Sequence, residues 1–372
     1  MSAATTQPSY LKSVFCCILA LLLCASGCTM VPLDGKNPST YHLAAPSDTR
    51  IANRLRQELS EPPETPRGTS LIRLQASGYE AWEDRLRLIQ LSDHSLDLQY
   101  FSWDTDESGM VLMEQVVQAA NRGVRVRLLL DDMLAVDQEF LARLAAHSNI
   151  DVRLFNPFST QRIHVVMRPF EWLAKERVNV RMHNKVFIAD GTVGMVGGRN
   201  IENRYFWVDQ SFNQRDLDAV VIGEVITELQ VSFDNYWNSM WAVPIERLES
   251  PVKPRQARRY FRGLHQYSNE QLATPAFVNI APTPLERYRI SRDMLAAEIE
   301  FIADDPDKVV DRQPQQFDRL NALTDDAQQR VLLGMAYLVP SDAVVSQVEA
   351  LTSRGEEVKV LTNSMESINF TA

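Results

Sequence analysis

Residues 183–200 hold a histidine, a lysine, an aspartate and an asparagine in a spacing that suits attack on a phosphodiester. The short apolar run 186–189 predicts a strand over residues 182–190, and side chains alternate between the two faces of a strand. His183 and Lys185 are two residues apart, so we expect them on the same face. A neutral imidazole can attack phosphorus, and an ammonium beside it can neutralise the phosphate oxygens as charge develops. Neither step requires a metal ion.

The residues that follow this pair could complete a phosphate site. Asp190 ends the predicted strand, where a carboxylate can orient an imidazole and stabilise its positive charge. A turn then leads into a second predicted strand over 193–196. Gly197 and Gly198 leave backbone amides uncovered close to an anion, and Asn200 offers a neutral amide donor. We therefore expect Asp190 to orient the histidine and the other three residues to bind phosphate.

The whole spacing resembles the signature of the phospholipase D superfamily: H-x-K, four residues, D, six residues and G-G-x-N. Flanking segments resemble its cardiolipin synthase branch, closest to the C-type members, and they lie at 125–132, 152–158, 181–185, 196–206, 215–223 and 233–239. The resemblance extends from about residue 69 to the C-terminus. It implies an α/β fold with a mixed or parallel sheet flanked by helices. It also implies a covalent phosphohistidine at His183, with Lys185 and Asn200 holding the phosphate and Asp190 orienting the imidazole.

A partial internal repeat is visible near the C-terminus, where residues 353–364 resemble residues 121–132. Members of the family normally have two halves with one motif each. We therefore expect a first domain at 69–242, a linker at 243–284 and a partial second domain at 285–372. At the same offset the second histidine would fall at about position 415, beyond Ala372. In the family that histidine is the general acid, so we expect this chain to be impaired unless a homodimer or a complementing fragment supplies it.

The N-terminus predicts a lipid-anchored envelope protein. Lys12 precedes an apolar run over 14–25, which is shorter than the roughly 20 residues of a transmembrane helix and fits the core of a signal peptide. The run ends in Ala-Ser-Gly-Cys28, which resembles a bacterial lipobox. We expect a signal peptide over 1–27, lipidation at Cys28, a flexible tether over 28–68 and a periplasm-facing position on a membrane. The choice between inner and outer membrane stays open.

The charge composition limits the classes of partner that the protein can bind. The formal net charge of −10 argues against a dedicated nucleic-acid-binding protein, which is normally basic over its binding domain. Residues 162–185 nevertheless carry six Lys or Arg against two Glu, and such a patch can attract anionic head groups or nucleic-acid phosphates. No pair of histidines has the spacing of a metal site, and we expect no metal or other cofactor. The expected partner is an anionic phospholipid of the phosphatidylglycerol type.

Hydrophobic periodicity predicts the elements around the motif. Helices are expected over 79–91, 109–120 and 225–237, and strands over 95–103 and 124–130. The strand-helix-strand order implies a crossover onto a parallel or mixed sheet. Asp131 and Asp132 lie at the carboxyl end of the last strand, where we expect them to cap the next segment rather than to act in catalysis.

The sequence is compatible with three functions. The first is phosphatidyl transfer, in which phosphatidylglycerol is joined to an acceptor to give cardiolipin. The second is a phosphodiesterase acting on nucleic acid as a single-motif homodimer. The third is a non-catalytic, membrane-tethered remnant that binds anionic lipid.

Overall fold

The computed structural model describes residues 37–59, 69–134, 137–157, 180–209, 211–279, 282–311, 315–336 and 342–364. The predicted signal peptide, Cys28 and most of the basic segment 162–185 lie outside the described residues. The chain divides into two compact units. One contains the residues up to Phe301 together with 309–311, and the other contains 302–308 and the residues from 312 onwards.

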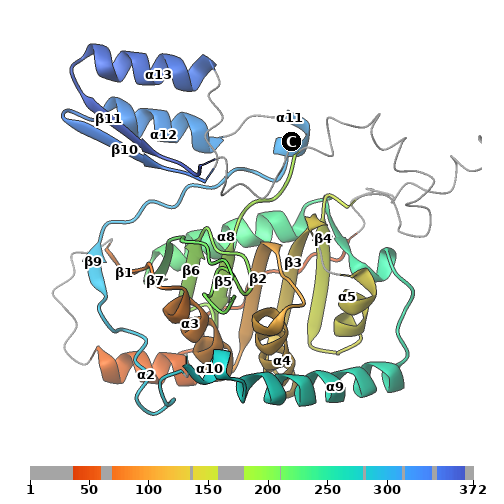
Figure 1. Cartoon of the computed structure of the whole chain (residues 1–372). Helices are drawn as coiled ribbons and strands as arrows, with labels where there is room; N and C mark the ends of the chain where they lie inside the picture. The colour runs from red at the N-terminus through yellow and green to blue at the C-terminus, as the bar shows by residue number, and fades with distance from the viewer. Residues whose placement is uncertain are drawn as a thin grey trace, which may run out of the picture. The chain divides into compact units, whose positions relative to one another are not determined.

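The first unit is built on a mixed sheet, which confirms the expected fold class (Figure 1). Among the described residues this sheet has nine strands in the order β8-β4-β3-β2-β5-β6-β7-β1-β9. The three neighbours β2, β3 and β4 are parallel, and the remaining pairs are antiparallel. The strands are β1 (Ser70–Gln75), β2 (Ser95–Ser102), β3 (Arg125–Leu134), β4 (Ile150–Phe155), β5 (Val186–Ala189), β6 (Val193–Gly197), β7 (Asp218–Ile222), β8 (Ala242–Pro244) and β9 (Leu295–Ala297).

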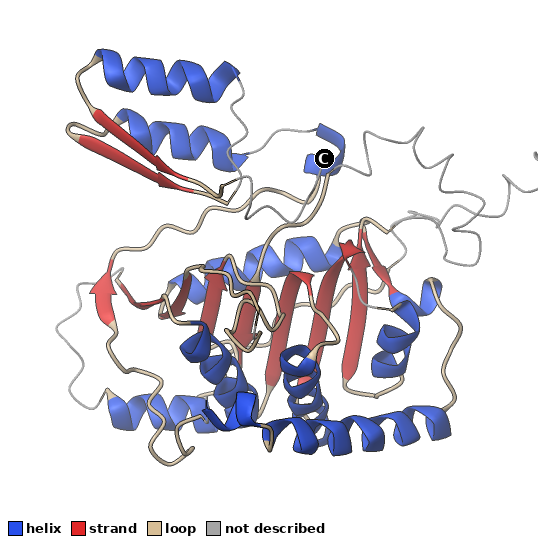
Figure 2. Ribbon diagram, in the orientation of Figure 1, coloured by secondary structure: helices blue, strands red, loops and turns tan. Residues whose placement is uncertain are grey.

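Helices cover both faces of this sheet (Figure 2). Helix α8 packs on one face, whereas α3 and α4 pack on the other, and α9 lies outside α4 and α5. The alternation of side chains along β3 explains the two cores, because Leu128 and Leu130 join one apolar cluster and Leu129 joins the other. The helices of this unit are α2 (Arg50–Glu58), α3 (Gly78–Leu91), α4 (Glu107–Asn121), α5 (Gln138–Ala145), α8 (Val225–Asn238), α9 (Pro254–Leu272) and α10 (Pro275–Asn279), with a 3₁₀ turn at Ile245–Arg247.

The strongly periodic segments fold as the sequence predicts. The helices expected over 79–91, 109–120 and 225–237 are α3, α4 and α8, and the strands expected over 95–103 and 124–130 are β2 and β3. The strand expected over 182–190 is shorter, since only Val186–Ala189 pairs with neighbouring strands.

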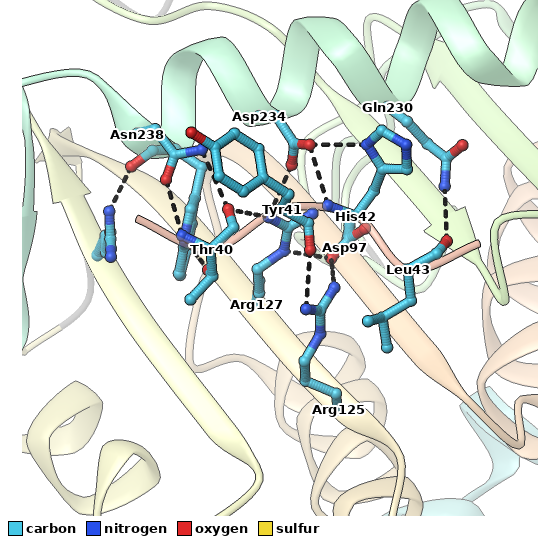
Figure 3. Close-up of polar contacts among 12 residues, drawn as sticks. Thr40, Tyr41, His42, Leu43, Asp97, Arg125, Arg127, Gln230, Asp234 and Asn238 are labelled. Carbon is cyan, nitrogen blue, oxygen red and sulfur yellow. Dashed lines mark hydrogen bonds and ion pairs between the residues drawn. The ribbon is translucent and has the colours of Figure 1, made fainter. Parts of the chain in front are cut away.

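The described part of the expected tether is structured, which differs from the sequence prediction. Residues 50–58 form α2. The segment 40–43 lies against α8 and the sheet (Figure 3). The reason is a group of buried arginines that need acceptors. Arg127 pairs with Asp97 and Asp234, each at 2.7 Å, and donates to the carbonyl of Thr40 at 3.0 Å. The backbone of the segment therefore completes a buried ionic network.

The expected linker at 243–284 is also structured. It contains α9, whose Leu264 is buried in the core and whose Tyr260 packs on Phe140 of α5 with ring centroids 5.8 Å apart. Strand β9 then pairs with β1. The division between units consequently falls after Phe301 rather than before residue 285.

The second unit contains a strand-helix-strand arrangement. Strands β10 (Arg330–Gly334) and β11 (Glu357–Leu361) are parallel, and the helices are α12 (Gln315–Asp325) and α13 (Asp342–Ser353). Helix α11 (Lys308–Asp311) spans the division between the units. Gly355 after α13 has a positive φ of 89°, as Gly123 after α4 has at 101°. Both glycines end a helix just before a strand, so the two segments paired by the repeat share their local structure. Within the described ranges, no helix combines the length and apolar character needed to cross a bilayer.

Candidate active site

Strand pairing brings the motif residues to one edge of the sheet. Val186 at the start of β5 faces Gln99 near the end of β2, and it also faces Val196 near the end of β6. Gly197 faces Asp218, the first residue of β7. The residues just before β5, just after β6 and just before β7 therefore lie together, although they come from three separate parts of the chain.

His183 and Lys185 meet around the ring of Phe101. The imidazole of His183 is exposed and packs on this ring with centroids 4.9 Å apart. Lys185 is only 5% exposed, and its Nζ lies 5.5 Å from the centroid of the same ring. The ammonium also donates to the carbonyl oxygen of His183 at 2.8 Å. The two side chains thus lie at the same ring, but both residues precede the strand instead of lying on one face of it.

Burial controls the charge of Lys185. Desolvation lowers the pKa of its ammonium to about 8, while the carboxylates of Asp216, Asp218, Asp131 and Glu202 oppose that shift. A protonated ammonium is therefore held at neutral pH in a partly dehydrated position. Such a cation interacts with a phosphate oxygen more strongly than it would in water.

Asn200 lies at the same edge of the sheet as His183 and Lys185. Its side chain is 6% exposed, and its Oδ1 accepts a hydrogen bond from the backbone amide of Ser102 at 3.2 Å. This contact fixes the amide plane. Its side chain also hydrogen-bonds Tyr205, whose pKa is raised to about 12 by burial and by the nearby carboxylates of Glu202 and Asp216.

Gly197 and Gly198 are required for a different reason from the one expected. A Cβ atom on Gly197 would lie 2.0 Å from Oδ1 of Asp218, and one on Gly198 would lie 2.1 Å from Oδ1 of Asp216. The amide of Gly198 is already bonded to the carbonyl of Leu217 at 3.3 Å. The two glycines thus let two carboxylates approach the main chain, and the amide of Gly198 points to a protein acceptor.

The expected role of Asp190 is wrong in this structure. Its buried carboxylate accepts hydrogen bonds from the backbone amides of Asp93, His94 and Ser95 at 2.8–3.2 Å. Strand β5, roughly 13 Å long at 3.3 Å per residue, separates Asp190 from His183. The carboxylate therefore fixes the turn before β2 and does not orient the imidazole.

Asp131 holds the main chain beside His183, a role that the sequence did not reveal. Its Oδ2 accepts from the backbone amide of Met182 at 2.8 Å, and its Oδ1 accepts from the amide of Met133 at 2.8 Å. It also pairs with Arg181 at 3.5 Å. This buried carboxylate thus holds the main chain immediately before His183. The expected capping role falls to Asp137, which is the N-cap of α5.

Arg199, inside the motif, is a fully buried cation that joins the surrounding loops. Its guanidinium donates to the carbonyls of Gln75 at 2.9 Å and Ala76 at 2.8 Å, and it also contacts the carbonyl of Asp216. Asp218 pairs with it at 3.5 Å and with Arg85 at 2.9 Å. These contacts fix the segments that surround Lys185. The segment 215–223 resembles the cardiolipin synthase branch in sequence, but the sequence predicts no role for its aspartates.

Comparison with known proteins shows the family of this chain. Residues 86–237 match the family described as "Cardiolipin synthase, PLD-like domain", and this range contains His183, Lys185 and Asn200. The chain is 32% identical over 293 residues to cardiolipin synthase C of Escherichia coli K12, covering 77% of this chain and 61% of that protein. The chain belongs to the phospholipase D superfamily. Within the superfamily it lies in the cardiolipin synthase-like branch, which confirms the resemblance found in the sequence.

Other relatives of this branch have similar coverage. An uncharacterized protein of Helicobacter pylori strain J99 is 32% identical over 333 residues, which is 87% of this chain and 64% of that protein. The chain thus spans 61% and 64% of the length of these two relatives. The solved phosphatidylserine synthase of Haemophilus influenzae Rd KW20 is similar at 13% identity over 86% of this chain and 69% of that chain, with a TM-score of 0.49.

Proposed function

We propose that this protein transfers a phosphatidyl group through a covalent phosphohistidine at His183, with phosphatidylglycerol as the donor and cardiolipin as the product. A nitrogen of the neutral imidazole attacks phosphorus, the bond from phosphorus to the glycerol oxygen breaks, and the departing alkoxide takes up a proton. The hydroxyl of a second lipid then attacks the phosphohistidine, loses its proton and releases the imidazole.

The observation that carries this proposal is the placement of the ammonium of Lys185. It lies against the ring that packs on His183, and it is bonded to the carbonyl of that histidine. A phosphate bound to this ammonium is therefore close to the imidazole, which is the arrangement that an in-line attack needs. Asn200 is held at the same edge and can offer an amide donor to the phosphate.

The proton for the leaving alkoxide must come from a second group. The printed sequence contains one H-x-K motif. We propose that the donor belongs to a second motif, carried by a longer form of the chain, by a second copy or by a separate fragment. A general acid typically contributes ~10²–10⁴ in rate, so the single motif by itself should act slowly on phosphatidylglycerol.

The test uses a substrate whose leaving group needs no proton. In a soluble p-nitrophenyl ester of a short-chain phosphatidic acid, attack by His183 releases p-nitrophenolate directly. We expect a burst of colour equal in amount to the protein, followed by slow turnover. His183→Ala should abolish the burst. His94→Ala is the matched control, because the backbone amide of His94, which donates to Asp190 at 2.8 Å, is kept in this variant, and the variant should retain the burst.

The outcomes separate the competing functions. No burst in the unaltered protein, or an equal burst in His183→Ala, would contradict covalent catalysis at His183. The result would favour the non-catalytic, lipid-binding function instead. Burst formation from this ester together with efficient cleavage of single-stranded DNA would favour a phosphodiesterase. Cardiolipin formation from labelled phosphatidylglycerol, assayed with and without a fragment containing a second motif, would test the transfer step.

We also propose a position on the membrane of the cell envelope, facing the periplasm, with lipid attached at Cys28. The support is the sequence alone: the apolar run over 14–25 and the Ala-Ser-Gly-Cys ending. A lipid chain would keep the site close to a phospholipid substrate.

A further inference from the structure

Helix α9 carries a basic surface that the proposed chemistry does not use. Residues 253–262 contain five Lys or Arg and no Asp or Glu, within a chain of net charge −10. Four of these residues are exposed arginines, which we call the arginine stripe: Arg255, Arg258, Arg259 and Arg262.

The arginine stripe points away from the body of the first unit. At about 100° per residue its members fall within an arc of roughly 100° on the helix surface. The buried residues Ala257, Leu264 and Ser268 lie on the opposite side. That opposite side packs on α4 and α5, and α9 crosses both of them on their outer side (Figure 1). The arginines therefore face outward over a length of about 10 Å along the helix.

The arginine stripe has no ion-pair partner among the described residues, and only Arg259 shares a hollow with carboxylates, those of Glu139 and Glu249. None of its members forms an ion pair or a side-chain hydrogen bond with any residue that the structure describes. Arg255 and Arg259 are four residues apart, as are Arg258 and Arg262, and like charges at this spacing destabilise a helix by about 0.2–0.5 kcal/mol per pair. The first turn also lacks an acidic residue at the positive end of the helix dipole. An external anionic surface would relieve all of these repulsions.

We propose that the arginine stripe of α9 docks the protein on an anionic phospholipid bilayer. The charges are complementary, and an outward-facing helix can lie along a bilayer surface, where arginine side chains reach the head groups. The choice of a bilayer over a nucleic acid rests on the proposed function, because a phosphatidyltransferase must meet its substrate in a membrane. The acidic net charge also opposes a nucleic-acid partner.

The expected size of the effect follows from the number of charges. Each Lys or Arg near an anionic leaflet contributes about 1 kcal/mol, or about fivefold in affinity. The variant Arg258→Gln/Arg262→Gln removes two charges, so its affinity for the bilayer should fall about 30-fold. Its thermal stability should be unchanged or slightly higher, because one repulsive pair is removed.

The experiment measures vesicle flotation of the protein. All proteins begin at position 28 with Ser in place of Cys28, so that neither the expected signal peptide nor an attached lipid contributes. Vesicles contain phosphatidylcholine alone or with about one-third phosphatidylglycerol. We expect binding only to the anionic vesicles. Raising the salt from about 0.1 M to about 1 M shortens the Debye length from about 10 Å to about 3 Å and should release the protein.

The matched control is Arg287→Gln/Arg289→Gln, which removes two exposed arginines outside α9 and should bind like the parent. Equal binding by both double variants would overturn the proposal. Tighter, stripe-dependent binding of a short DNA duplex than of the vesicles would overturn it in favour of nucleic acid. The p-nitrophenyl ester burst is measured in solution and does not involve α9. A failure of vesicle binding would therefore not affect the burst, and a failure of the burst would not affect vesicle binding.

Discussion

The buried ammonium of Lys185 makes phosphate binding depend on pH in a range where phosphodiesters themselves do not titrate. Burial lowers its pKa to about 8. The ammonium is then about 90% protonated at pH 7 and about 10% protonated at pH 9. If only the charged form binds phosphate, the affinity for a phosphodiester should fall about tenfold between these two pH values.

The assay is calorimetric titration with a short-chain phosphatidylglycerol below its micelle concentration. Binding alone is measured, so the result does not depend on a second motif. Lys185→Arg is the informative variant, because a guanidinium stays protonated throughout this range. We expect weaker binding by Lys185→Arg at pH 7, since the buried position fits an ammonium, but little change in its affinity up to pH 9.

Two results would refute this reasoning. Constant affinity of the unaltered protein from pH 7 to pH 9 would mean that Lys185 keeps its charge or does not bind the phosphate. The same tenfold fall in Lys185→Arg would mean that another group causes the pH dependence.

Four further predictions concern the same edge of the sheet and the N-terminus. Lys185→Met should raise the free energy of unfolding at pH 7 by up to about 3 kcal/mol in urea denaturation. Burial lowers the pKa of Lys185 from its usual 10.5 to about 8 in the folded state, so the cost of the buried charge is full below pH 8 and disappears as the pH rises through 10.5. Asp216→Asn removes the carboxylate that most strongly raises the pKa of Lys185, so the fall in phosphatidylglycerol affinity should move to lower pH; an unmoved midpoint would contradict this. Asp190→Ala leaves three amides of the turn 93–95 without their acceptor and should cost about 3 kcal/mol of stability, while the p-nitrophenolate burst per folded molecule stays unchanged; a lost burst would restore an orienting role. Metabolic labelling with a fatty acid should mark the unaltered chain and not Cys28→Ser, and equal, negligible label in both would rule out the anchor.

The sequence by itself determined the family motif and most of the regular elements around it. The spacing of His183, Lys185 and Asn200 was sufficient to predict that they lie at one edge of the sheet, because these residues flank a single hairpin and their separation is fixed by two short strands. Helices α3, α4 and α8 followed from their apolar periodicity, since one buried face at 3.6 residues per turn is a local property of the chain.

The tertiary structure alone decided which carboxylates surround Lys185. Asp131, Glu202, Asp216 and Asp218 reach it from different parts of the chain, and their distance depends on the register of strands that a single sequence does not specify. The same dependence explains the error at Asp190. It stands at the expected place in the motif, yet the length of β5 carries its carboxylate to the other end of the strand, where the amides before β2 bind it.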